Sequence, residues 1–152
     1  MIKSGIRKEL RETYFRFLIP SIVLLVIFYI IKFLGLIGDI QIESLHLISI
    51  LLFVLAAVFS IALPIFYRTL FVSKLKNVKT ISISEFIGFE KRLIIISMIT
   101  PYIIIIPLTF NFTDFYFGGI ILFALYAVYY FYPSKKRIEF EKKLFRIKEE
   151  TK

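Results

Sequence analysis

The chain has 152 residues, of which 59% are apolar and 18% aromatic, and it carries a formal net charge of +9 and no cysteine. Its mean hydropathy of +0.83 is too high for a soluble domain, because a fold of this size has too little interior to bury so much apolar surface. The composition therefore excludes a soluble globular enzyme and an intrinsically disordered chain. The lack of cysteine excludes disulfides, thiol catalysis and cysteine-ligated metal.

Four long apolar segments follow one another along the chain. Each has close to the ~20 residues that a helix needs to cross the ~30 Å hydrocarbon core of a bilayer. Barrel strands would instead alternate apolar and polar residues. We therefore predict an all-α fold, in which one polytopic domain covering residues 1–152 forms a small bundle of four transmembrane helices. The predicted spans are Phe17–Ile37, Leu45–Tyr67, Leu93–Phe110 and Phe115–Tyr132.

The basic residues indicate how the chain threads through the membrane. All 20 Lys and Arg residues except Lys32 lie in the head 1–16, the loop 68–92 or the tail 133–152. The positive-inside rule then places both termini and the loop in the cytoplasm. We expect a multi-pass protein of the bacterial inner or plasma membrane. No basic cluster carries the interleaved aromatics of a strand-binding surface, so we predict no nucleic-acid partner.

Apolar residues recur at every fourth position of the head, which predicts an amphipathic helix leading into the first span. They are Ile2, Ile6, Leu10 and Tyr14. In the loop, Ser84 is the predicted N-cap of a helix that enters the third span.

Pro133 is expected to end or kink the fourth span, because proline has no backbone N–H. A tail helix should follow, with Phe140, Leu144 and Ile147 on one face.

The basic residues near the spans form a predicted collar, for which two interpretations stay open. In one, the collar sets the topology and rests on anionic lipid of the inner leaflet, at ~1 kcal/mol per basic residue. In the other, it binds a cytoplasmic protein. The first is favoured, because any small multi-pass protein shows the same charge bias. The collar consists of Arg68, Lys74, Lys76, Lys79, Lys91, Arg92, Lys135, Lys136 and Arg137.

Within the spans, small and weakly polar residues fall on one line of the second and third segments. Ser49, Ser60, Ser97 and Thr100 make up this polar seam. Such residues usually serve helix packing in membranes, and the alternative is a narrow polar pathway. Pro101 and Pro107 also predict a kinked third span.

The sequence offers little chemistry inside the membrane. No Asp, Glu or Arg lies within a predicted span, which argues against coupled transport and proton relays. Lys32, Asp39, Glu43 and His46 could form a titratable cluster at the outer boundary, but a weak surface pairing is the favoured interpretation. We find no catalytic set, metal site or cofactor motif and predict that the chain is not an enzyme.

These observations favour a non-catalytic accessory, anchoring or scaffold subunit of a membrane assembly, with a membrane or cytoplasmic protein partner. The alternative is a small oligomeric channel, holin-like pore or passive transporter. Four short helices cannot enclose a wide lumen, so this alternative requires a homo-oligomer.

Overall fold

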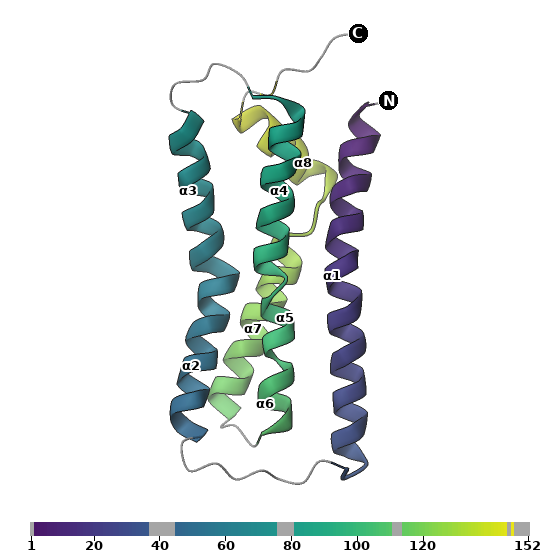
Figure 1. The fold of residues 1–152 in the computed structure, drawn as a ribbon, viewed down its shortest axis with the longest axis vertical. Helices are drawn as coiled ribbons and strands as arrows, with labels where there is room; N and C mark the ends of the chain where they lie inside the picture. The colour runs from purple at the N-terminus through teal and green to yellow at the C-terminus, as the bar shows by residue number, and fades with distance from the viewer. Residues whose placement is uncertain (1, 37–44, 76–80, 111–113, 146, 148–152) are drawn as a thin grey trace.

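The computed structural model describes residues 2–36, 45–75, 81–110, 114–145 and 147. Long helices run up and down one axis and form a bundle (Figure 1). The elements in chain order are α1 (Ile2–Phe33), α2 (Leu45–Ala57), the π-helical turn η1 (Val58–Ala62), α3 (Leu63–Leu75), α4 (Ile83–Ser97), α5 (Thr100–Ile103), α6 (Ile105–Thr109), α7 (Asp114–Tyr130) and α8 (Lys135–Leu144).

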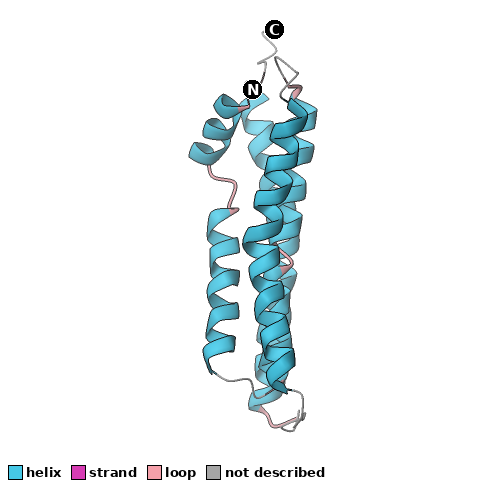
Figure 2. Ribbon diagram, turned by 90° about the vertical axis from the view of Figure 1, so that its left-hand side faces the viewer, coloured by secondary structure: helices cyan, strands magenta, loops and turns pink. Residues whose placement is uncertain are grey.

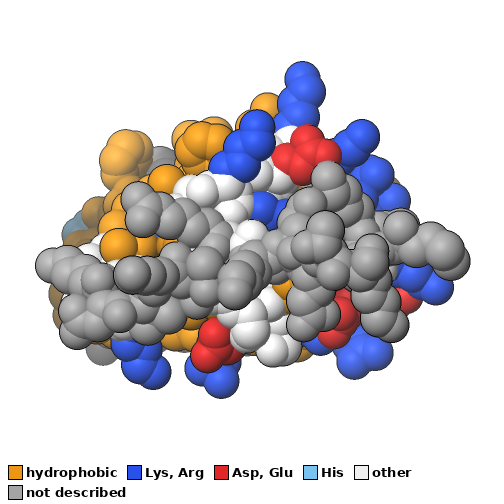
Figure 3. All heavy atoms as spheres, turned by 90° about the horizontal axis from the view of Figure 1, so that it is seen from above, with side chains coloured by type: hydrophobic (Ala, Val, Ile, Leu, Met, Phe, Trp, Pro, Cys, Tyr) orange, Lys and Arg blue, Asp and Glu red, His pale blue; other side chains and the backbone are white. Residues whose placement is uncertain are grey.

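One end of the bundle holds the start of α1, the end of α3, the start of α4 and all of α8 (Figure 1). We call it the basic end and define it as residues 2–16, 68–75, 81–92 and 131–145. Viewed along the bundle axis, this end shows Lys and Arg side chains around its rim (Figure 3).

Three helical stretches are long and apolar enough to cross a membrane: Gly5–Phe33, His46–Leu75 and Ile83–Thr109. α7 and α8 add a fourth if this pair, bent by 75°, is counted as one broken span. The predicted all-α, multi-pass fold is therefore confirmed, with three or four helices that could cross the bilayer.

The helices at the basic end are longer than the predicted spans. α1 includes nearly the whole head, and Ile6, Leu10 and Tyr14 of the predicted amphipathic helix are buried. α3 continues past Tyr67 to Leu75 and α4 begins at Ile83, so most of the predicted loop 68–92 is helix.

A π-helical turn joins α2 to α3. Pro64 has no N–H to donate, and its ring would clash with the carbonyl of the residue four positions earlier. The backbone widens just before this proline, where the Leu63 N–H donates to the Val58 carbonyl five residues back. The Ser60 hydroxyl donates to the Ala57 carbonyl at 3.3 Å. The second span therefore stays continuous despite its proline.

The N-cap of α4 lies two residues before the expected one. The N-cap is Ser82 and not Ser84, so that prediction was wrong. The Ser82 hydroxyl accepts a hydrogen bond from the Glu85 N–H at 3.3 Å, and the Glu85 carboxylate accepts one from the Ser82 N–H at 3.4 Å. This reciprocal capping box needs a Glu three residues after the cap, and Ser84 has no such partner.

Replacing Ser82 by alanine should lower the free energy of unfolding by about 1 kcal/mol. The Glu85 N–H loses its hydrogen-bond acceptor, and the reciprocal arrangement with the Ser82 N–H is lost. Ser84→Ala is the matched control, since within the described residues the Ser84 side chain hydrogen-bonds only to the Ser82 hydroxyl and does not cap the helix. Thermal unfolding in mild detergent, followed by circular dichroism, measures both. Equal effects of the two variants would contradict the assignment of the cap.

The third span, which was predicted to be kinked, is divided into three successive helices. α4 ends at Ser97, and short helices α5 and α6 follow, with Pro101 and Pro107 inside them. The backbone turns at Met98 and Ile99 instead of continuing the helix into Pro101.

The buried apolar residues form two clusters. The larger lies mainly at the basic end, and the smaller lies between α2, α5 and α7. The larger cluster contains Ile6, Leu10, Tyr14, Ile81, Phe86, Phe89, Leu93, Ile94, Met98, Phe131, Ile138 and Phe145. The smaller contains Leu52, Ala56, Ile103 and Ile120. The largest continuous core therefore lies where the sequence predicted mostly surface segments.

α7 packs closely on α2 at Gly119. A Cβ atom at this position would overlap the ring of Phe53, whereas a Cβ at the neighbouring Gly118 would meet nothing within 4 Å. The Phe53 ring is itself enclosed by the rings of Phe115, Tyr116 and Phe123, so it has little room to move aside.

Gly119→Ala should therefore destabilise the bundle by about 1–3 kcal/mol through overpacking. Gly118→Ala should be neutral or slightly stabilising, because alanine is the better helix former. The comparison requires only unfolding curves of both variants in the same detergent. A stable Gly119→Ala variant would show that α2 and α7 are not held this closely.

Candidate functional site

α8 lies across the basic end because the chain turns sharply after α7. α7 ends at Tyr130, and the predicted role of Pro133 as a stop signal is confirmed. The Ser134 hydroxyl then accepts a hydrogen bond from the Arg137 N–H at 3.2 Å and caps α8. A short loop separates the two helices (Figure 2). This turn carries two charged side chains of α8 to α3 and α4.

The first charged contact joins α8 to α4. An Arg137 Nη atom donates to a Glu90 carboxylate oxygen at 2.7 Å, and Glu90 is only 2% exposed. The same guanidinium donates to the Tyr130 carbonyl at 3.4 Å and lies 5.3 Å from the centroid of the Phe131 ring. A carboxylate so deeply buried is stable only with its cation in place.

The second charged contact joins α8 to α3. An Arg68 Nη atom donates to a Glu141 carboxylate oxygen at 2.9 Å. The Glu141 side chain is buried, while that of Arg68 is partly exposed. The Arg68 guanidinium also lies 5.9 Å from the centroid of the Phe145 ring. Together the two pairs fix α8 to both neighbouring helices.

Besides its apolar residues in the larger core, α1 is attached through tyrosine hydroxyls and an outer ion pair. The Tyr14 hydroxyl donates to the Val128 carbonyl at 2.8 Å, and the Tyr102 hydroxyl donates to the Phe17 carbonyl at 2.7 Å. Lys91 pairs with Glu9 at 2.6 Å, but both side chains are largely accessible. Such an exposed pair contributes about 0–1 kcal/mol.

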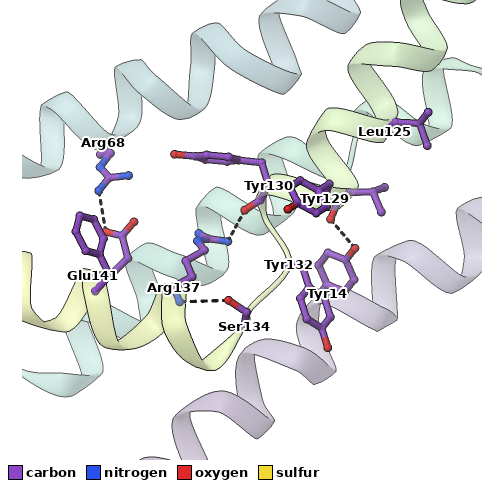
Figure 4. Close-up of a pocket in the computed structure, with 11 residues that line it drawn as sticks. Tyr14, Arg68, Leu125, Tyr129, Tyr130, Tyr132, Ser134, Arg137 and Glu141 are labelled. Atoms are coloured by element: carbon purple, nitrogen blue, oxygen red, sulfur yellow. Dashed lines mark hydrogen bonds and ion pairs between the residues drawn. The ribbon is translucent and has the colours of Figure 1, made fainter.

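A cavity of about 720 Å³ lies beside these contacts, between α7 and α8. In Figure 4 the Arg68 side chain points to Glu141, and Arg137 points to the Tyr130 carbonyl. The wall of the cavity combines two arginines and one glutamate with four tyrosines and apolar groups. The lining residues are Tyr14, Arg68, Leu125, Val128, Tyr129, Tyr130, Tyr132, Ser134, Arg137, Phe140 and Glu141.

A second cavity, of about 890 Å³, lies between α3 and α4. The rings of Phe71 and Phe89 stack there with their centroids 4.0 Å apart. Lys74, Glu85 and Arg92 contribute charged groups to its wall.

The predicted polar seam lies inside the bundle. Ser49, Ser60, Ser97 and Thr100 are all buried. Neither the Ser97 nor the Thr100 hydroxyl has a hydrogen-bond partner within the part of the chain that the structure describes. Burial within a single chain fits the favoured interpretation, in which these residues pack between helices.

The proposed outer cluster lies partly outside the described residues, since Asp39 and Glu43 are not among them. His46 is exposed and meets the ring of Tyr116 at 5.6 Å, edge to face. No ion pair of Lys32 occurs within the described ranges.

The predicted collar divides into residues with different environments. Arg68 and Arg137 belong to the charged contacts of α8, while Lys135 and Lys136 are exposed on its first turn. Lys91 pairs with Glu9, and Arg92 donates to the Tyr67 hydroxyl at 3.3 Å. Lys74 lines the cavity between α3 and α4. Lys76 and Lys79 lie outside the described residues.

The predicted tail helix is present as α8, and Phe140 and Leu144 are both exposed on it. The helix ends at Leu144, so Ile147 lies beyond it and does not share this face. The buried side consists of Ile138, Glu141 and Phe145, and Glu141 points inward to Arg68.

Sequence reasoning also missed the buried Glu90. A signal was present, since Glu90 stands at helical spacing between Phe86 and the buried pair Leu93 and Ile94. A carboxylate in the middle of an apolar helix face predicts a buried cation partner.

The described residues contain no group of three or more His, Cys, Asp or Glu side chains that could hold a metal ion. Comparison of the chain with protein-family models, with curated proteins and with solved structures found no match.

Proposed function

We propose that this chain is a non-catalytic accessory, anchoring or scaffold subunit of a membrane assembly, and that its basic end faces the cytoplasm. The observation that supports this best is the packing of the basic end, which contains most of the larger core and the ion pairs Arg68–Glu141 and Arg137–Glu90. Buried charged pairs are expensive to desolvate, and they fix one arrangement of helices. A rigid end of this kind suits a docking surface.

The outward face of α8 is the part of this surface that we assign to a protein partner. The ion pairs hold the inner face of the helix, and Phe140 and Leu144 remain exposed on the other side beside Lys135 and Lys136. An aromatic and an aliphatic side chain next to exposed lysines can contact an acidic, partly apolar protein surface.

A photo-crosslinking amino acid at position 144 tests this assignment in intact cells, because Leu144 does not line the cavity between α7 and α8. We expect one predominant protein adduct, because a fixed surface selects one partner. The same group at position 26 is the control, since Val26 is about as exposed as Leu144 but lies in the apolar part of α1. Adducts with lipid alone at position 144, or the same protein adducts at both positions, would contradict the proposal.

The proposed orientation rests on the positive-inside rule. A fluorescent protein fused after Lys152 should fold and fluoresce, whereas alkaline phosphatase at the same site should be inactive. The reverse pattern would place the basic end outside the cytoplasm.

A second candidate function, a small channel or passive transporter formed by several copies, is favoured by one observation. The buried Ser97 and Thr100 hydroxyls have no partner in the described part of the chain, so water or a polar solute could satisfy them. Purified protein in liposomes should then conduct ions or small solutes, and Thr100→Val should reduce the flux. Liposomes without flux would remove this candidate.

A further inference from the structure

The cavity of Figure 4 carries charges of both signs. Arg68, Arg137 and Glu141 line it, and Arg137 is also paired with Glu90, which is not a lining residue. Each arginine is thus already paired with a carboxylate, Arg68 with Glu141 and Arg137 with Glu90, so an incoming anion competes with these carboxylates for the guanidinium groups. A group with a single negative charge would meet the Glu141 carboxylate as well as the guanidinium groups.

The guanidinium groups retain capacity to bind. Each arginine has five N–H donors in a planar fork. Within the described chain Arg68 donates one side-chain hydrogen bond, to Glu141, and Arg137 donates two, to Glu90 and to the Tyr130 carbonyl. The remaining donors suit the oxygens of a phosphate, which guanidinium groups bind in bidentate fashion.

The tyrosines of the cavity can bind a cationic group, which complements the binding of a phosphate by the arginines. Tyr14, Tyr129, Tyr130 and Tyr132 all line the cavity. Aromatic faces attract ammonium groups, and clusters of aromatic rings recognise choline-like cations. The Glu141 carboxylate adds a negative group on the same wall.

The position of the cavity fits a lipid. Leu125 and Val128 lie on the apolar helix α7, whereas Arg68 lies on α3 and Arg137 on α8, at the basic end of the bundle. Tyrosines concentrate at the level of the headgroups in membrane proteins. Tyr129 is 86% exposed, so the cavity reaches the lateral surface of the bundle.

We propose that this cavity binds the headgroup of a zwitterionic phospholipid. The phosphate lies against Arg68 and Arg137, and the ammonium lies among the tyrosine rings next to Glu141. A primary ammonium can also donate a hydrogen bond to the Glu141 carboxylate, whereas a quaternary ammonium cannot. The site therefore prefers phosphatidylethanolamine to phosphatidylcholine, and it prefers both to the anionic phosphatidylglycerol. This selectivity is separate from the general attraction of the exposed lysines for anionic lipid and does not depend on the proposed scaffold role.

Native mass spectrometry of the full chain tests the proposal. The protein is released from detergent in the presence of equal amounts of the three phospholipids with identical acyl chains. We expect each chain to retain one lipid. Phosphatidylethanolamine should be retained most, phosphatidylcholine less, and phosphatidylglycerol least. Water-soluble glycerophosphoethanolamine should not displace it, because this compound has no acyl chain to contact Leu125 and Val128.

Tyr129→Ala should lower retention of phosphatidylethanolamine by about fivefold through loss of one aromatic face. The exposed position of Tyr129 means that the fold should not depend on this side chain. Tyr29→Ala, on the exposed face of α1 and outside the cavity, is the matched control and should retain the lipid as the unchanged protein does. Preferential retention of phosphatidylglycerol, equal retention of all three lipids, or unchanged retention in Tyr129→Ala would overturn the proposal.

Discussion

Arg137→Ala should lower the free energy of unfolding by about 3–5 kcal/mol, because it leaves the Glu90 carboxylate buried without a cation. The loss should exceed that of an ordinary surface arginine, since the guanidinium also donates to the Tyr130 carbonyl and packs on Phe131. Chemical unfolding in mild detergent, followed by circular dichroism, measures the difference.

Two further variants make the test specific. Lys91→Ala also removes a cation from the basic end, but from the more exposed pair with Glu9. It should therefore change the free energy of unfolding by no more than about 1 kcal/mol. The double variant Glu90→Leu with Arg137→Met removes both buried charges and should recover most of the lost stability. If Arg137→Ala and Lys91→Ala unfold alike, the Glu90–Arg137 pair does not stabilise the fold in this way.

Phe86→Ala should have a comparably large effect, about 3–5 kcal/mol, because it opens a cavity in the larger core. Phe86 is fully buried in α4, and its ring lies 6.3 Å from that of Phe145 beyond the end of α8. Charged residues flank it along α4, so water is the alternative solvent for this part of the helix and apolar burial is favourable there.

Phe66→Ala is the control for this substitution, since Phe66 is largely exposed on α3. It should change the free energy of unfolding by less than about 0.5 kcal/mol. Limited proteolysis adds a second measurement, because loosening of the Phe86 site should also expose the segment that contains Phe145. Indistinguishable unfolding and proteolysis of the two variants would show that the core at the basic end is not what holds α8.

Hydropathy and proline positions predicted the helical, multi-pass architecture well. Length and apolar content determine which segments can cross a bilayer. Pro133 and Pro101 lie at breaks between helices, whereas Pro20 lies inside α1 and the helix stays continuous at Pro64 through the π-helical turn, so a proline alone does not fix where a helix ends. Helix ends at the basic end were placed less well. The cap at Ser82 depends on Glu85 three residues later, a spacing that the choice of Ser84 overlooked.

The charged contacts were the part that sequence patterns could not supply. Glu90 and Arg137 are 47 residues apart in the chain, and Arg68 and Glu141 are 73 apart. Both pairs form because the chain bends by 75° between α7 and α8, which brings α8 against α3 and α4. The sequence predicted that the basic head, loop and tail lie at the same end of the spans (Figure 1), but it could not show that two of the arginines face inward.

The two arginine–glutamate contacts also constrain how the protein is made. α8 follows all the helices that it joins, so the ribosome completes α3 and α4 before Arg137 and Glu141 exist. During that interval the nascent chain has Arg68 and Glu90 without their counterions. Insertion of the earlier helices therefore precedes final assembly, and the bundle reaches its mature form only after synthesis has passed Glu141.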